Sequence, residues 1–219
     1  MSVERWDEAL PLGRWLEAVA SPQPLPAGGR VASVAAAFAA ALVEKIGRIV
    51  LRSPSRSTLH LEAEAVAARA AALRPLLLVL GDADDRAYAA VLAARRTGGG
   101  AAASGPLQDA ELSAARLQVT LIEYCVEVIE LAQHLEARVG LALGADLATA
   151  QHLARAAALG ARGNVEADLA NLAADSRAEA IRAGAANALG RVMHIAGGSA
   201  RPQQQPGSPQ HKADPGDAA

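Results

Sequence analysis

The segment from Pro26 to Ser33 has the residue types of an anion-binding helix N-terminus. It contains Gly28 and Gly29, followed by Arg30 and then an alanine-rich stretch. Glycines can take φ > 0, so their amides can turn inward, and the free N–H groups of the helix that follows point the same way. The helix dipole adds partial positive charge, which favours a carboxylate or a phosphate. A plain turn before a helix has the same pattern, so both interpretations stay open.

Three further polar residues lie on one face of a predicted helix. Asn164 and Asp168 are four residues apart, so their side chains are neighbours. Asp146 shares that face because it stands five turns before Asn164, but it is then about 27 Å away at ~1.5 Å per residue. Within one subunit, Asp146 and Asn164 reach the same reacting atom only if Gly160 or Gly163 bends the helix. An extended ligand along the face is one alternative, and we favour a site shared across a dimer.

Each of these residues also has an interpretation without a function. Asp146 is well placed as a helix N-cap, and Asn164 with Asp168 could simply mark a helix end. Arg30 could equally be a ligand contact or a surface residue. The five histidines are scattered along the chain and predict surface or capping roles, so no metal site is expected.

Proline and glycine divide the chain into helices that must position these residues. Prolines between Ser21 and Arg30 interrupt one connection, and the glycines of Gly98–Gly100 interrupt another. Pro75 is expected to kink or divide the helix that contains it. The predicted helices are Val3–Ala20, Val31–Leu51, Thr58–Arg96, Leu107–Leu143, Asp146–Asp168 and Ser176–Ile195. We expect one helical domain over residues 1–196 and a disordered tail over residues 197–219, which is rich in Gly, Pro, Gln and Ser.

Composition predicts an all-α fold, a multihelical bundle of long and short helices. Hydrophobic residues make up 52% of the 219 residues and aromatic residues only 2%. Alanine is the best helix former, whereas the β-branched and aromatic residues that favour strands are scarce. Small side chains also predict close contacts between helices.

Charge and cysteine content exclude several classes of protein. The formal net charge of -2 argues against a nucleic-acid partner with a broad basic surface. The single Cys125 excludes a disulfide framework and is consistent with the reducing cytoplasm. The charged N-terminal residues do not resemble a signal peptide. The longest weakly apolar run, Val31–Val43, is too short to cross a bilayer, so no membrane partner is expected.

Three segments match, in order, the motifs of one protein family. The stretch from Pro26 to Val43 resembles a helix that begins with Pro-Gly-Gly-Gly-Ser. Asp84–Arg96 resembles the pattern D-x-x-A-[FY]-x-x-V-x-x-A-x-R. Asp146–Leu169 resembles a signature that begins Asp-Leu and ends in N-V-x-x-N-L. The resemblance as a whole covers roughly residues 5–195. The chain thus resembles the formiminotransferase-cyclodeaminase C-terminal family, which includes bacterial methenyltetrahydrofolate cyclohydrolases.

Some positions depart from the family pattern. Arg30 stands in place of a serine, Val50 in place of a threonine, and Thr97-Gly98 in place of Leu-Pro. Asp168 stands in place of the second asparagine of the third motif. These positions lie where the resemblance places the substrate. A catalytically degenerate helical dimer that binds folate or has a structural role is therefore the alternative to an active enzyme.

The resemblance implies a homodimeric enzyme of folate one-carbon metabolism. It would hydrolyse 5,10-methenyltetrahydrofolate to 10-formyltetrahydrofolate, or carry out the related cyclodeamination of 5-formiminotetrahydrofolate. The folate is the substrate, and no separate cofactor or metal is expected. The methenyl bridge is an amidinium-like cation, so a carboxylate near it would stabilise it and could deprotonate the attacking water. The implied catalytic residues are Asp146, Asp168 and Asn164. The implied substrate-binding residues are Gly28, Gly29, Arg30, Arg48, Asp84, Tyr88 and Arg96, with the arginines facing the glutamate carboxylates of folate.

Overall fold

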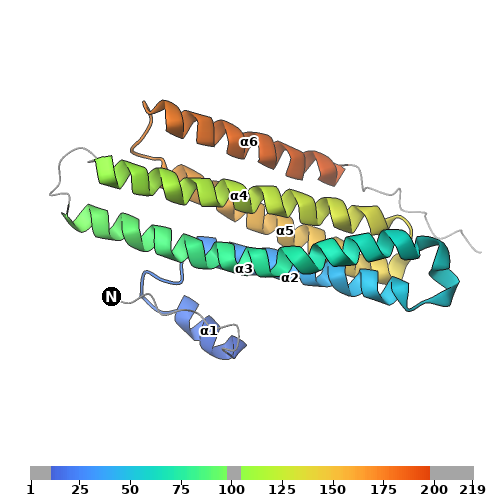
Figure 1. The fold of residues 1–219 in the computed structure, drawn as a ribbon. Helices are drawn as coiled ribbons and strands as arrows, with labels where there is room; N and C mark the ends of the chain where they lie inside the picture. The colour runs from blue at the N-terminus through green and yellow to red at the C-terminus, as the bar shows by residue number, and fades with distance from the viewer. Residues whose placement is uncertain (1–10, 98–104, 198–219) are drawn as a thin grey trace, which may run out of the picture.

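The computed structural model describes residues 11–97 and 105–197, and every element in these ranges is helical. The elements are α1 (Leu12–Val19), α2 (Gly28–Leu51), the short 3-10 helix η1 (Pro54–Leu59), α3 (His60–Thr97), α4 (Gly105–Glu136), α5 (Leu141–Asp168) and α6 (Ser176–Gly197). Helix α2 packs on α3 and α5, and α4 packs on α3, α5 and α6. Figure 1 shows the long helices running side by side as one elongated bundle, with α1 set off from it. The all-α prediction is confirmed.

The observed helix ends differ from the predicted ends at glycine and proline. Helix α2 begins at Gly28, three residues before the predicted start, because its glycines are helical. Helix α3 continues through the exposed Pro75 and is not divided there. Helix α4 ends at Glu136, and Gly140, with φ of 80°, is the N-cap of α5. The predicted helix end at Leu143 and the interpretation of Asp146 as an N-cap are therefore wrong.

Three sequence predictions fall partly or wholly outside the described residues. The first half of the predicted helix Val3–Ala20 lies there, as does the glycine-rich connection after Thr97. The predicted disordered tail also lies there, except for Gly197, which ends α6.

Alanine fills much of the interior, as the composition predicts. Ala36, Ala39 and Ala40 of α2 have no exposed surface. Gly47 lies so close to α3 that a Cβ atom built on it would be 2.8 Å from the Cβ of Ala67. The helices therefore approach one another closely, and the interior has little room for larger side chains.

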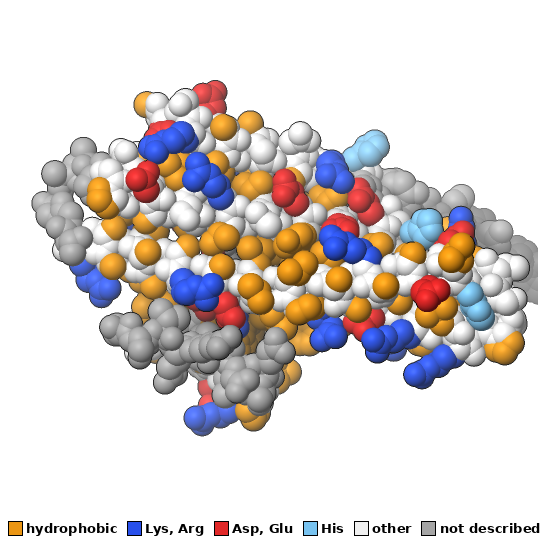
Figure 2. Space-filling view, viewed as in Figure 1, with side chains coloured by type: hydrophobic (Ala, Val, Ile, Leu, Met, Phe, Trp, Pro, Cys, Tyr) orange, Lys and Arg blue, Asp and Glu red, His pale blue; other side chains and the backbone are white. Residues whose placement is uncertain are grey.

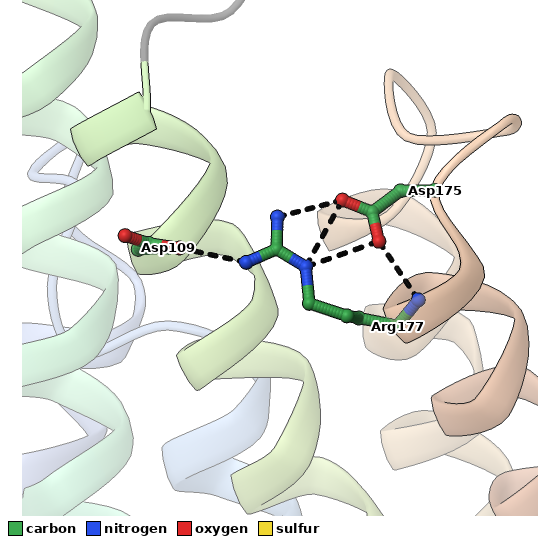
Figure 3. A network of polar contacts seen from close by, with 3 residues as sticks. All are labelled: Asp109, Asp175 and Arg177. Atoms are coloured by element: carbon green, nitrogen blue, oxygen red, sulfur yellow. Dashed lines mark hydrogen bonds and ion pairs between the residues drawn. The ribbon is translucent and has the colours of Figure 1, made fainter.

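A polar network holds the start of α6 against α4 (Figure 3). The Asp175 carboxylate accepts a hydrogen bond of 2.8 Å from the backbone N–H of Arg177, which caps the helix. The Arg177 guanidinium pairs with Asp175 at 2.7 Å and with Asp109 of α4 at 3.1 Å. This arrangement fixes the end of the bundle near which α5 also ends.

The surface is of mixed charge. Figure 2 shows Lys and Arg side chains interspersed with Asp and Glu side chains over the visible face, with hydrophobic side chains between them. Within residues 11–97 and 105–197, no helix has both the length and the hydropathy needed to cross a membrane.

Candidate functional site

The first turn of α2 meets side chains from three other helices. Its N-cap residue, Ala27, supplies no side-chain cap, so the free amides of this turn are left to other groups. A Cβ atom on Gly29 would overlap the Asp84 carboxylate of α3 and the Gln118 amide of α4. A Cβ atom on Gly28 would lie 3.7 Å from the Oδ1 atom of Asn164 on α5. The pair of glycines therefore allows these polar side chains to approach the helix N-terminus.

A chain of hydrogen bonds links three of these helices. The Nδ2 atom of Asn164 donates to the Oε1 atom of Gln118 at 3.4 Å. The Nε2 atom of Gln118 donates in turn to the Oδ1 atom of Asp84. Gln118 is 2% exposed and Asp84 is 6% exposed, so the chain is largely removed from water.

Asp168 lies one turn after Asn164 on α5 and forms a second layer of polar side chains next to the hydrogen-bond chain. In this layer the fully buried Glu111 of α4 pairs with Arg95 of α3 at 3.0 Å. Burial, together with the charges of Asp84 and Glu111, raises the pKa of Asp168 to about 7, although the charge of Arg95 lowers it. Asp168 is therefore a carboxyl group that can accept or release a proton near neutral pH.

Arg30 crosses from α2 to α3 at the edge of this site. Its buried guanidinium forms an ion pair with Asp82. Gly81 provides the space, because a Cβ atom there would lie 2.8 Å from the Cδ atom of Arg30. Burial lowers the pKa of the Arg30 guanidinium. Burial also raises the pKa of Asp85, which is 1% exposed, to about 6, although the charge of Arg30 lowers it.

Carboxylates outnumber guanidinium groups around the first turn of α2. The carboxylates are Asp82, Asp84, Asp85, Glu111 and Asp168, and the guanidinium groups are Arg30, Arg86 and Arg95. The partial positive charge of the helix N-terminus thus faces the protein's own carboxylates. Such a site suits a cationic ligand group better than an anionic one. Among the described residues, no cluster of three His, Cys, Asp or Glu side chains could hold a metal ion.

The structure brings together six of the residues proposed from sequence: Gly28, Gly29, Arg30, Asp84, Asn164 and Asp168. Tyr88 is half-buried one turn after Asp84 on α3, and Arg96 is exposed next to Arg95. Two other residues lie elsewhere. Asp146 of α5 pairs with Lys45 of α2 at 2.7 Å, and Arg48 of α2 pairs with Glu44 of the same helix. Both ion pairs lie at the part of α2 that is remote from its first turn.

Sequence reasoning missed Gln118, Glu111 and Arg95. Glu111 and Gln118 are seven residues apart, so they share one face of α4. That face is otherwise apolar and includes the buried Leu121 and Cys125. Polar residues in a helical stripe of buried apolar positions are therefore the signal that would have found them.

The fold and the site together define the class of protein: an all-helical protein with a cluster of acidic side chains between four of its long helices. The family profile of Formiminotransferase-cyclodeaminase matches residues 11–187, and the chain belongs to this family. A crystal structure of formiminotetrahydrofolate cyclodeaminase from Thermotoga maritima has a similar fold, with a TM-score of 0.71 and 24% sequence identity. The match covers 86% of this chain and 96% of that chain. The search of curated proteins found no significant match. The resemblance inferred from the three motifs is thus confirmed.

Proposed function

We propose that the protein is an enzyme of folate one-carbon metabolism that acts on the carbon between N5 and N10 of tetrahydrofolate. The leading reaction is the hydrolysis of 5,10-methenyltetrahydrofolate to 10-formyltetrahydrofolate, and the related reaction is the cyclodeamination of 5-formiminotetrahydrofolate. One observation carries the proposal. Asp168, whose pKa burial raises to about 7, lies in an acidic cluster at the first turn of α2.

The hydrolysis needs a base beside a cationic carbon. The oxygen of a water molecule bonds to the methenyl carbon, and Asp168 takes one proton of that water. The bond between this carbon and N5 then breaks, its electrons return to N5, and N5 takes the proton back from Asp168. The hydroxyl group loses its proton and becomes the formyl oxygen on N10, so one proton is released overall. A group that titrates near neutral pH is suited to this exchange.

The remaining groups of the cluster have complementary roles. The negative charge of Asp84 stabilises the cationic bridge in a largely water-free site. The half-buried Asn164, one turn from Asp168, is placed to orient the water by a hydrogen bond. In cyclodeamination the protonated form of Asp168 would donate to the departing ammonia. The same side chain therefore fits both reactions of the amidine carbon.

The test is an absorbance assay of the methenyl group, run in two ways. In the first assay purified protein is mixed with 5,10-methenyltetrahydrofolate and loss of the absorbance is compared with buffer. In the second assay the protein is mixed with 5-formiminotetrahydrofolate, and the increase in methenyl absorbance is followed. We expect acceleration in at least one assay. Calorimetric binding of folate without turnover would support the degenerate alternative. The absence of both binding and turnover would show that folate is neither substrate nor ligand.

Asp168→Ala should lower turnover by roughly 10²-fold or more, because it removes the proton acceptor. The matched control is Glu166→Gln on the same helix, whose exposed carboxylate pairs with Arg162. We expect this control to keep its activity. Turnover of the wild-type protein by hydrolysis should rise as the pH increases through about 7, because the base must be ionised. Equal losses in both variants would contradict the assignment of Asp168.

A further inference from the structure

The buried amide of Gln118 is bound at both ends. Its oxygen accepts from the Nδ2 atom of Asn164 at 3.4 Å, and its nitrogen donates to the Oδ1 atom of Asp84. An amide side chain has one accepting end and one donating end. Because Asn164 provides a donor, the oxygen of Gln118 faces α5 and the nitrogen must face Asp84.

This orientation favours the ionised state of Asp84. An ionised carboxylate accepts the N–H of Gln118, whereas a proton on Oδ1 would bring two donors together. Turning the Gln118 amide over would relieve that clash, but it would bring the Nε2 atom of Gln118 against the Nδ2 atom of Asn164 unless the Asn164 amide turned over as well. With Asn164 donating, the hydrogen-bond chain therefore keeps a proton off Oδ1, and the bond from Gln118 is stronger to an ionised carboxylate than to one protonated on Oδ2.

We propose that Asn164 and Gln118 form a directional relay that holds Asp84 as a carboxylate against the first turn of α2. Gln118 is thus a positioning residue that acts through Asp84. The catalytic consequence of the relay rests on the proposed function. The relay itself does not, because it is a property of the folded protein.

The groups around Asp84 show why such a relay is needed. Burial raises the pKa of Asp84 above its ordinary value, and the hydrogen bond from Gln118 and the charge of Arg30 on α2 offset this only in part. Two other charged groups that interact with Asp84 are Asp85 on α3 and Asp168 on α5. These are carboxyl groups and oppose ionisation of Asp84 when they are charged. Arg30 and Gln118 therefore act against both burial and like charge.

The direct test is a carbon-13 NMR titration of the aspartate carboxyl groups. The Asp84 resonance is assigned by its loss in Asp84→Asn. Gln118→Met keeps a similar side-chain length but removes the donor, and we expect it to raise the titration midpoint of Asp84 by about one pH unit or more. Asn164→Ala leaves Gln118 in place but free to turn over, and we expect a smaller rise.

The matched control is Gln151→Met. Gln151 on α5 is also buried, at 4% exposure, and donates to the Glu136 carboxylate at 2.6 Å. This variant loses an equivalent hydrogen bond away from the first turn of α2, so the Asp84 midpoint should not move. An unchanged midpoint in folded Gln118→Met would overturn the relay. If Gln118→Met does not fold, an unchanged midpoint in Asn164→Ala would overturn it instead.

Kinetics supply the second readout. At neutral pH, Gln118→Met should lower kcat by about 10-fold or more with little change in KM, because the substrate still binds but the cation loses its charged neighbour. Turnover should recover as the pH is raised and Asp84 ionises, and Gln151→Met should behave as wild type. If wild-type protein turns over neither folate, the proposed function fails, while the NMR midpoints still decide the relay.

Discussion

At the scale of single residues, the site depends on a position that has no side chain. Gly29 lies where the Asp84 carboxylate and the Gln118 amide approach α2, and a Cβ atom would overlap both. Its neighbour Gly28 has more space, since a Cβ atom there makes only an ordinary contact of 3.7 Å with Asn164. The two adjacent glycines thus differ in the space that they leave for a side chain.

Gly29→Ala should lower the free energy of unfolding by roughly 1–3 kcal/mol, because buried polar groups must move to admit the methyl group. Gly28→Ala should be neutral or raise it by up to ~1 kcal/mol, since alanine favours a helix more than glycine does. Urea denaturation of both variants and the wild-type protein measures the difference. Similar unfolding energies for the two variants would contradict the close contact at Gly29.

The sequence predicted part of this site for a simple reason. Asn164 and Asp168 share a face because they are one helical turn apart, and glycines before an alanine-rich stretch predict a helix start. Gln118 has no local signal of this kind. Its role depends on the side-by-side arrangement of α3, α4 and α5, which places it between Asp84 and Asn164.

At the scale of elements, the fold tolerates residues that usually end helices. Helix α3 runs from His60 to Thr97 with Pro75 inside it. Proline lacks the backbone N–H and its ring crowds the carbonyl one turn earlier, which destabilises a helix interior. Because the side chain of Pro75 is exposed, packing gives no evident reason for its presence. The contacts of α3 with α2 and α4 outweigh the local signal at Pro75, which predicted a kink or a division of the helix.

Pro75→Ala should raise the free energy of unfolding by about 1–3 kcal/mol, because it restores a hydrogen bond and removes the steric conflict. The matched control is Pro54→Ala, since Pro54 lies at the first position of η1, where proline is favourable. We expect no gain from that control. Thermal and urea unfolding measure both, and a loss of stability in Pro75→Ala would show that α3 needs the proline.

Helix starts also explain the position of Asp146. The sequence predicts that this helix starts at Asp146, where an aspartate side chain could cap it. The structure uses Gly140, with φ of 80°. Asp146 is then inside the helix and pairs with Lys45 at 2.7 Å. A local pattern could not distinguish the two starts, because the choice depends on how α4 turns into α5.

At the scale of the whole molecule, the chain leaves several apolar side chains exposed. Phe38, the single phenylalanine of the sequence, is 54% exposed on α2. Val31 is exposed on the same stripe, two turns earlier, and Leu76 and Val79 are exposed on the neighbouring α3. No residue of α1 is buried, although its leucines Leu12 and Leu16 are a turn apart. We propose that the exposed apolar side chains of α2 and α3 bind a second copy of the chain, because exposed apolar area is typical of interfaces.

Phe38→Arg should convert a dimer to a monomer, because it places a charge in the proposed interface. Met193→Arg is the matched control, since Met193 on α6 is 51% exposed. We expect it to leave the assembly unchanged. Sedimentation velocity of the three proteins measures the mass, and a monomeric wild-type protein at micromolar concentration would refute the proposed interface.

The alanine-filled interior has a consequence for how the protein can change over evolutionary time. Where a core is built from leucine or phenylalanine, a mutation can shrink one side chain while another grows. Ala36, Ala39 and Ala40 are fully enclosed, and nearly every replacement would add volume. Any such addition must push whole helices apart, and the positions of Asp84, Gln118 and Asn164 would shift with them. The spacing of the backbones, rather than any single side chain, is therefore the property that selection has to preserve.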